Sequence, residues 1–100
     1  MPYLKKDYKL LKIERSKDPK KKYDAVLENK QNGRIKRMSF GSRPMQQYRD
    51  STKLKLYKSK DHLDKNRKKA FLDRFRKLRE RQDWNKEWTS LYFSTKYLWT

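Results

Sequence analysis

The sequence has no cysteine, only two glycines and no apolar run longer than the three residues Leu91-Tyr92-Phe93. Without cysteine the chain has no disulfide, no thiol nucleophile and no cysteine-ligated zinc. Two isolated glycines do not build a glycine-rich phosphate loop. A run of three apolar residues is far shorter than a membrane span or the core of a signal peptide. We therefore expect neither a membrane span nor secretion, and we do not expect an enzyme.

Large apolar side chains are also scarce, since Leu, Ile, Val and Phe make up 18 of the 100 residues. Highly charged chains below about 20% of these residues are usually disordered. Aromatic residues, however, reach 14%, and each ring buries roughly 150–250 Å² when it packs. We therefore expect one small domain over residues 1–100, with a thin core that depends on aromatic rings.

Basic residues are abundant: 30 Lys and Arg face 12 Asp and Glu, which gives a formal net charge of +18. Such an excess repels itself and attracts anions. Nucleic-acid backbones, acidic capsid surfaces and anionic lipids all fit this description. The sequence has no zinc-finger spacing and no clear RRM or helix-turn-helix pattern. Binding to nucleic acid is therefore expected to use backbone contacts and to tolerate any sequence.

The first half of the chain has the alternating pattern of β-strands. Strands are predicted over Tyr8–Arg15, Lys22–Asn29 and Arg34–Gly41. Asn32-Gly33 favours positive φ and is a strong signal for a hairpin between the last two strands. These segments predict a three-stranded antiparallel meander over residues 8–41, one face of which must be covered.

The second half predicts helices. Residues 42–58 form an irregular loop, and a long helix over residues 59–82 is capped by Ser59 or Asp61. A short aromatic helix within residues 84–99 is capped by Thr89 or Ser90. The predicted fold is α+β, with the long basic helix packed across the meander. Two core sets are consistent with the strand pattern: Tyr23, Leu27 and Ile35, or Val26, Met38 and Phe40, in each case against Phe71, Phe75 and Leu78.

Three arginines, Arg67, Arg74 and Arg81, fall inside the apolar arc of the long helix. In one interpretation their stems lie along the sheet and their heads either snorkel to solvent or pair with Asp24, Glu28 or Asp50. In the other, their guanidinium groups form a row that reaches a phosphate or a partner's carboxylate. The candidate contacts to an anionic partner are Lys20, Lys21, Lys22, Arg67, Lys68, Arg74, Arg76, Arg79 and Arg81.

His62 is the only histidine and lies between Asp61 and Asp64. Acidic residues in the first turn of a helix are far more often capping groups than metal ligands. We therefore expect no metal site, no catalytic residues and no cofactor.

The C-terminal segment concentrates aromatic residues, and two interpretations are open. The rings either close this protein's own core or insert into a neighbouring protein, because Trp and Tyr are enriched at interfaces. The candidate docking residues are Trp84, Trp88, Tyr92 and Trp99. If they dock, a chain without residues 84–100 keeps its hairpin and long helix but no longer assembles.

Short motifs in order along residues 22–99 resemble a family of small basic proteins of unknown function encoded by nucleocytoplasmic large DNA viruses. The resemblance lies in Lys22-Tyr23-Asp24-Ala25-Val26-Leu27, Ser39-Phe40-Gly41-Ser42, Tyr48-Arg49-Asp50-Ser51-Thr52, Leu56-Tyr57, Asp61-His62-Leu63-Asp64-Lys65 and Tyr92-Phe93-Ser94-Thr95-Lys96-Tyr97-Leu98-Trp99. The segment Thr52-Lys53-Leu54-Lys55-Leu56 differs, because the family has glycines there. The first 20 residues lie outside the resemblance.

The resemblance implies a viral setting rather than a catalytic activity. With the basic surface and the aromatic tail, it leads us to expect a virion structural protein, either a minor capsid or a capsid-lining component, made in the infected host cell. Its expected partners are capsid proteins of the same virion, with nucleic acid as a further partner and no small-molecule substrate. The alternatives are a sequence-tolerant nucleic-acid-binding protein that accompanies or condenses viral DNA, and a basic ribosome-associated protein.

Overall fold

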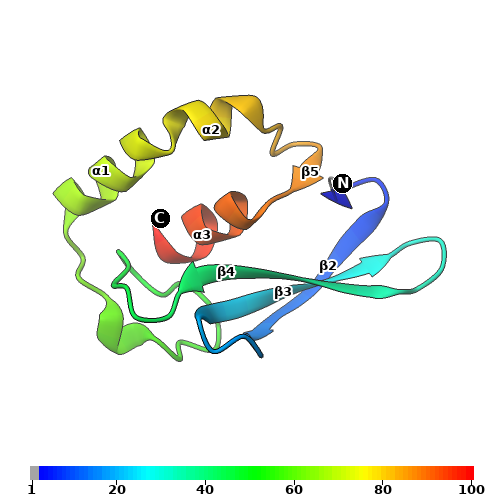
Figure 1. Cartoon of the computed structure of the whole chain (residues 1–100), viewed down its shortest axis with the longest axis horizontal. Helices are drawn as coiled ribbons and strands as arrows, with labels where there is room; N and C mark the ends of the chain where they lie inside the picture. Colours follow the sequence, from blue (N-terminus) through cyan, green and yellow to red (C-terminus); the bar gives the residue numbers. More distant parts are fainter. Residues whose placement is uncertain (1–2) are drawn as a thin grey trace.

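The computed structural model describes residues 3–100 and has the predicted α+β fold. Three antiparallel strands, β2 (Tyr8–Arg15), β3 (Lys21–Asn29) and β4 (Ile35–Ser42), form a sheet with the order β2-β3-β4. The predicted meander is therefore confirmed, and Figure 1 shows the long β3–β4 hairpin at one end of the molecule. A two-residue strand β1 (Tyr3–Leu4) also pairs with β5 (Glu87–Trp88), which the sequence did not predict because neither strand is long enough to show a pattern.

The hairpin register decides which side chains share the buried face of the sheet. Gly33, at φ +71°, allows the turn between β3 and β4, as the Asn-Gly signal predicts. Tyr23 then lies opposite Phe40, and Glu28 lies opposite Ile35. Directly opposed residues project from the same face, so Tyr23 and Phe40 enter the core while Ile35 stays exposed. The core therefore combines members of both predicted sets.

The helix expected over residues 59–82 is instead a 3-10 turn, η1 (Lys58–Lys60), followed by α1 (Lys65–Arg74) and α2 (Arg76–Arg81). Phe75 interrupts it with φ −98° and ψ 8°. The cap of α1 is Asp64, whose carboxylate accepts hydrogen bonds from the backbone N–H groups of Asn66 and Arg67. The prediction of Ser59 or Asp61 as the cap was wrong, because Asp61 accepts hydrogen bonds inside the loop that precedes α1.

The helix that lies on the sheet is α3 (Ser90–Leu98), whereas α1 and α2 arch over it (Figure 1). The side chain of Thr89 caps α3 as predicted, by accepting from the backbone N–H of Tyr92 at 3.0 Å. Phe93 and Leu98 are fully buried with Tyr23 and Phe40. The structure thus differs from the expected packing of the long basic helix across the meander, since α1 and α2 contain no buried residue. A sheet face built from Tyr23 and Phe40 needs an apolar cover, and α3 is the least charged helix.

Gly41 allows α3 to approach the sheet closely. Its φ of +77° is unfavourable for other residues, and a Cβ atom at this position would lie 2.7 Å from Leu98 Cδ1. The glycine therefore serves both the bend at the end of β4 and the contact with the end of α3.

The irregular segment before α1 is held by the buried carboxylate of Asp50. Its Oδ2 accepts from the hydroxyl of Tyr23 at 2.5 Å and from the backbone N–H of Tyr57 at 3.1 Å. Its Oδ1 accepts from the hydroxyl and the backbone N–H of Thr52, at 2.6 and 3.0 Å. A buried carboxylate is tolerated when its oxygens are satisfied in this way. The loop is consequently fixed to the sheet at Tyr23.

Much of the aromatic C-terminal segment packs into this protein's own core, which supports the first interpretation of the tail. Phe93 stacks on Phe40 at a centroid distance of 5.6 Å and on Trp88 at the same distance. Trp88 Nε1 donates to the backbone oxygen of Tyr8, at the start of the sheet. Removal of residues 84–100 would therefore expose the buried face of the sheet, and we now expect this truncation to unfold the domain.

A first prediction concerns this core. We expect Phe93→Ala to lower the free energy of unfolding by about 3–5 kcal/mol, because the side chain is fully buried between the sheet and Trp88. Leu78→Ala serves as the control and is expected to change it by no more than about 0.5 kcal/mol, since Leu78 is 42% exposed. Urea denaturation followed by circular dichroism measures both values. Equal effects of the two substitutions would contradict the assignment of α3 as the core helix.

Candidate functional site

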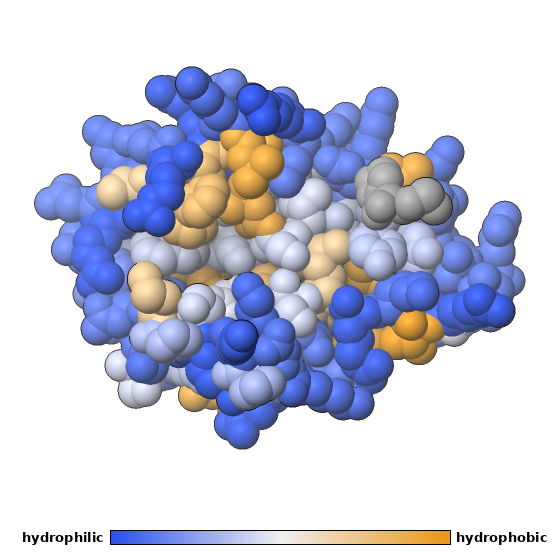
Figure 2. Space-filling model, in the orientation of Figure 1, coloured by the Kyte–Doolittle hydropathy of each residue, from blue (hydrophilic) through white to orange (hydrophobic). Residues whose placement is uncertain are grey.

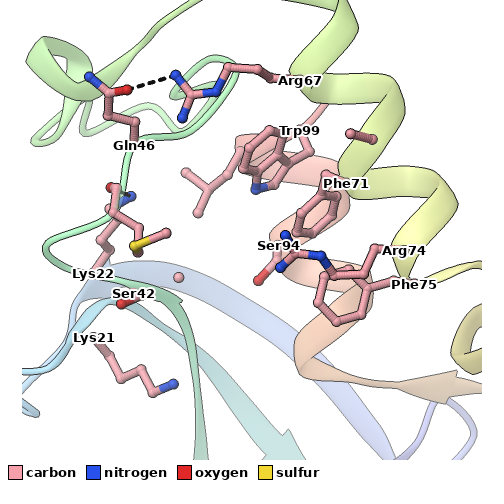
Figure 3. A pocket seen from close by; sticks show the side chains of 14 residues that line it. Lys21, Lys22, Ser42, Gln46, Arg67, Phe71, Arg74, Phe75, Ser94 and Trp99 are labelled. Atoms are coloured by element: carbon pink, nitrogen blue, oxygen red, sulfur yellow. Dashed lines mark hydrogen bonds between the residues drawn. The ribbon is translucent and has the colours of Figure 1, made fainter.

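A cleft of about 490 Å³ lies between α1 and the edge of the sheet (Figure 3). One wall is α1, the opposite wall is the start of β3 with the loop after β4, and α3 contributes the remaining side. Its lining residues are Lys21, Lys22, Gly41, Ser42, Met45, Gln46, Arg67, Ala70, Phe71, Arg74, Phe75, Ser94, Leu98 and Trp99. None of them is acidic.

The residues that α1 contributes follow from helical spacing. Arg67, Ala70, Phe71, Arg74 and Phe75 recur at intervals of three and four, which places them on one face of the helix. Phe71 stacks on Trp99 with ring centroids 4.3 Å apart and planes 2° from parallel. This stack ties α1 to the end of α3 and leaves the arginines on either side of it at the cleft.

Arg67 and Arg74 have no carboxylate partner. Among residues 3–100, the only carboxylate side chains within 4 Å of a Lys or Arg nitrogen are those of Glu14 and Glu28, which pair with residues of the sheet. Arg67 instead donates from Nη1 to the side-chain oxygen of Gln46 at 2.8 Å, across the cleft (Figure 3). The predicted pairing of these arginines with Asp24, Glu28 or Asp50 was therefore wrong, whereas both arginines are exposed, as the alternative of heads that snorkel to solvent expects.

The physical reason is that the three acids already have other partners. Asp24 accepts from the hydroxyl of Ser39 at 2.6 Å, Glu28 pairs with Lys9, and Asp50 holds the loop at Tyr23. In Figure 2, hydrophilic residues form the rims of the hollow beneath the α1–α2 arch, and less polar residues lie between them.

A second basic groove lies on the outer face of α1 and α2. It is shallow, and it brings together three of the predicted contacts, Lys68, Arg76 and Arg79, with Lys65 and Lys69. The Lys68 ammonium lies 4.8 Å from the centre of the Tyr48 ring, a cation–π distance. Arg79 is half-buried, and no partner for its Nε atom lies among the described residues.

The last three predicted basic contacts differ in their surroundings: Lys20 and Arg81 lie outside both grooves, whereas Lys22 lines the cleft with a buried side chain. Lys20 is exposed in the turn before β3, and Arg81 is exposed at the end of α2, outside both grooves. Lys22 was wrongly predicted as a surface contact, because its side chain is only 1% exposed. Its ammonium donates to the backbone oxygen of Met45 at 2.7 Å and to the side-chain oxygen of Gln47. The run Lys20-Lys21-Lys22 enters a strand, so its side chains alternate between environments.

Burial, and then the positive charge of Lys60, lower the pKa of the Lys22 ammonium from 10.5 to about 8, while Asp50 and Asp61 act in the opposite direction. Burial also raises the pKa of the Tyr23 hydroxyl from 10.0 to about 12, with a further contribution from its hydrogen bond to Asp50. Both groups therefore favour their uncharged forms more than they would in water.

His62 takes part in the start of α1. Its Nδ1 accepts from the backbone N–H of Asp64 at 2.9 Å, and its ring lies between those of Tyr48 and Trp99. Burial, and then the charge of Arg67, lower the pKa of His62 below its usual value. The surroundings are those of a structural residue at the start of α1.

The four predicted docking aromatics divide between two places. Trp84, Trp88 and Tyr92 form an edge-to-face cluster at the end of the core near β1 and β5. Trp99 alone lines the cleft. All four are half-buried in the chain itself, so they form no continuous aromatic surface.

Sequence reasoning missed Phe71 and Phe75 as cleft residues, since both were assigned to the sheet-facing core. The available signal was the arginine beside each ring on the same helical face, which is unfavourable for full burial. Gln46, Ser42 and Ser94 carried no signal at all, because only the fold brings them to the cleft.

Comparisons with protein-family models, with curated proteins and with solved structures find no match to this chain. The resemblance to a viral family therefore stays a prediction. Within residues 3–100, no helix has the length and apolar composition that crossing a membrane requires.

A second prediction follows from Lys22. Because its pKa is about 8 in the folded chain and 10.5 when unfolded, the unfolded state binds more protons between these values. Raising the pH from 8 to 10 should therefore stabilise the fold through this group. Above pH 10 the trend reverses at Tyr23, whose pKa is higher in the folded state.

The test compares the midpoint of thermal unfolding at pH 8 and at pH 10 in three proteins. We expect the gain from pH 8 to pH 10 to be smaller in Lys22→Met than in the wild type. Lys20→Met is the matched control, because it also removes one lysine but from an exposed site, and it should keep the wild-type gain. Identical gains in all three proteins would show that Lys22 titrates normally.

Proposed function

We propose that this protein binds nucleic acid without sequence preference, through phosphate contacts, and accompanies or condenses DNA in the particle of a large DNA virus. The observation that supports the binding most directly is the uncompensated charge of α1 and α2. The segment Lys65–Arg81 has nine basic and two acidic residues, and none of its basic groups lies within 4 Å of a carboxylate side chain among residues 3–100. The viral setting rests on the sequence resemblance alone.

A phosphate backbone is the partner that this charge distribution suits best. Each Lys or Arg that neutralises a phosphate releases condensed counterions, which supplies most of the affinity in sequence-independent binding. The same contacts relieve the repulsion within a chain of net charge +18. Binding of this kind carries no sequence information, since phosphate contacts position a protein without reading bases.

The basic groups are also arranged on both sides of the helix pair. Arg67 and Arg74 face the cleft, while Lys68 and Arg76 face the outer groove. A polyanion can therefore contact either side of α1. Alternatively, one nucleic-acid strand can follow one side of the helix while a second nucleic-acid strand follows the other. This arrangement favours a nucleic acid over a small anion.

Our second proposal is a minor capsid or capsid-lining role, in which the basic surface meets acidic capsid subunits. Trp84, Trp88 and Tyr92 lend it little support, since they pack within the chain. A different observation favours it: Leu11 and Leu54, each 45% exposed, line an apolar groove beside β2. Exposed apolar patches of this kind are common at protein interfaces.

A third prediction separates the two proposals by salt. The affinity for a labelled DNA duplex, measured by fluorescence anisotropy between about 50 and 200 mM salt, should fall linearly in log–log form with a slope of about −0.9 per phosphate neutralised. Arg76→Gln, at an exposed position of the outer groove, should make the slope shallower by about one unit. Lys36→Gln, on the distant hairpin, is the matched control and should leave the slope unchanged.

A flat salt dependence would contradict DNA binding. The capsid role is compatible with the same result, because apolar burial at a groove such as that of Leu11 and Leu54 is not screened by salt. Mass spectrometry of separated shell and nucleoprotein fractions of purified virions then places the protein in one fraction or the other, and recovery in the shell fraction alone would also contradict the first proposal.

A further inference from the structure

We propose that the cleft between α1 and the sheet edge is a single-strand-specific nucleotide site, in which Arg67 and Arg74 hold phosphates and the aromatic side chains contact unpaired bases. This proposal rests on the proposed nucleic-acid binding and adds to it the form of nucleic acid that this face of the protein recognises.

The first argument is the size and charge of the cleft. A volume of about 490 Å³ falls within the range of about 300–1,000 Å³ that ligand sites occupy. Lys21, Arg67 and Arg74 are the cations that face it, since the ammonium of Lys22 is hydrogen-bonded to Met45 and Gln47. Because no acidic residue lines the cleft, an anion that enters meets no repulsion from the walls.

The second argument is the order of charged and aromatic groups along α1. Arg67 and Arg74 are seven residues apart, or about 10.5 Å along a helix, and Phe71 lies between them on the same face. Phe75 follows Arg74, whose guanidinium carbon lies 5.8 Å from the centre of the Phe75 ring. In Figure 3 both arginines and Phe75 extend from α1 toward the cleft. Because Phe71 is itself stacked on Trp99, Phe75 is the ring that we expect a base to contact. Cations that follow a backbone, with a ring beside them for the bases, are typical of sites for single strands.

The third argument is the contrast between the two faces of the same helix. The outer groove contains Lys65, Lys68, Arg76 and Arg79 but only one aromatic ring, that of Tyr48. Such a surface attracts the phosphates of single and double strands alike. In a duplex the faces of the bases are covered by their stacked neighbours, so only unpaired bases can contact the rings of the cleft. The cleft should therefore discriminate between the two forms, and the outer groove should not.

The experiment measures the affinity of the full chain for labelled oligo(dT) and for a duplex of the same length, at one fixed salt concentration. Arg67→Gln/Arg74→Gln removes two charges from the cleft, and Lys65→Gln/Arg76→Gln removes two charges from the outer groove. All four residues are exposed, so both double variants should fold. Thermal unfolding followed by circular dichroism checks this for each protein.

We expect the cleft variant to lose about tenfold in affinity for oligo(dT) beyond its loss for the duplex, because removing the phosphate contacts also displaces the bases from the rings. The outer-groove variant should lose affinity for both ligands by the same factor. Phe75→Leu keeps an apolar side chain but removes the ring, and it should weaken binding of oligo(dT) alone.

Other outcomes overturn the proposal in distinguishable ways. Equal losses for both ligands in both double variants would leave nucleic-acid binding intact but remove the single-strand site. No binding of either ligand by the wild type would instead overturn the proposed function itself. If poly-glutamate binds the wild type and loses its affinity only in the cleft variant, while oligo(dT) binding is unchanged, the cleft is a site for an acidic protein segment.

Discussion

The buried carboxylate of Asp50 is the group on which the rest of the structure depends. It joins Tyr23 on the central strand to the backbone of the loop at Thr52 and Tyr57. The backbone N–H of Asp50 donates in turn to Asp61 at 2.8 Å, which fixes the chain just before α1 begins. Because a buried polar group that loses its partner is costly, the loop cannot detach at one of these points without weakening the others. The position of α1, and so the width of the cleft, follows from this network.

This polar network also adds to the uncompensated positive charge of the surface, which the 30 basic and 12 acidic residues already make large. Acidic residues are few, and several of them are used inside the molecule, where Asp50 and Asp61 hold the loop and Asp24 accepts from Ser39. The carboxylates that remain near cations, those of Glu14 and Glu28, lie on the sheet. The basic groups of α1 and α2 are thereby left without partners, which is costly for an isolated chain but favourable for one that meets a polyanion. The acidic residues that stabilise the fold are therefore not available to neutralise the basic residues of α1 and α2, which remain free to bind an anion.

Much of the sheet could be predicted from the sequence, because its signals are local. The bounds of β2 were predicted as observed, although a bulge between Leu10 and Lys12 interrupts its alternation, and Asn32-Gly33 marked the hairpin. Which helix covers the sheet could not be predicted in this way, because the answer depends on segments that are distant in the sequence. The three-to-four spacing of Phe71 with its neighbours is the same whether a helix faces a sheet or a cleft, and only competition with α3 decides between them. The burial of Lys22 was equally unpredictable from local sequence, because three consecutive lysines are typical of a solvated turn. The buried partner of its ammonium is Gln47, which is distant in the sequence.

The packing of α1 explains how a binding cleft persists in a chain with so small a core. In most small domains an aromatic face of a helix closes onto the sheet and leaves no space. Here Trp99, at the end of α3, takes the place of the sheet as the partner of Phe71 and holds α1 away from β4. The rings therefore contribute apolar contact without filling the volume between α1 and Lys21. Because the arginines on that face have no internal acid to reach, drawing α1 closer would bring cations together without compensation. Aromatic contact and charge repulsion thus act in opposite directions on α1, and an anion that enters the cleft removes the repulsion while keeping the contact.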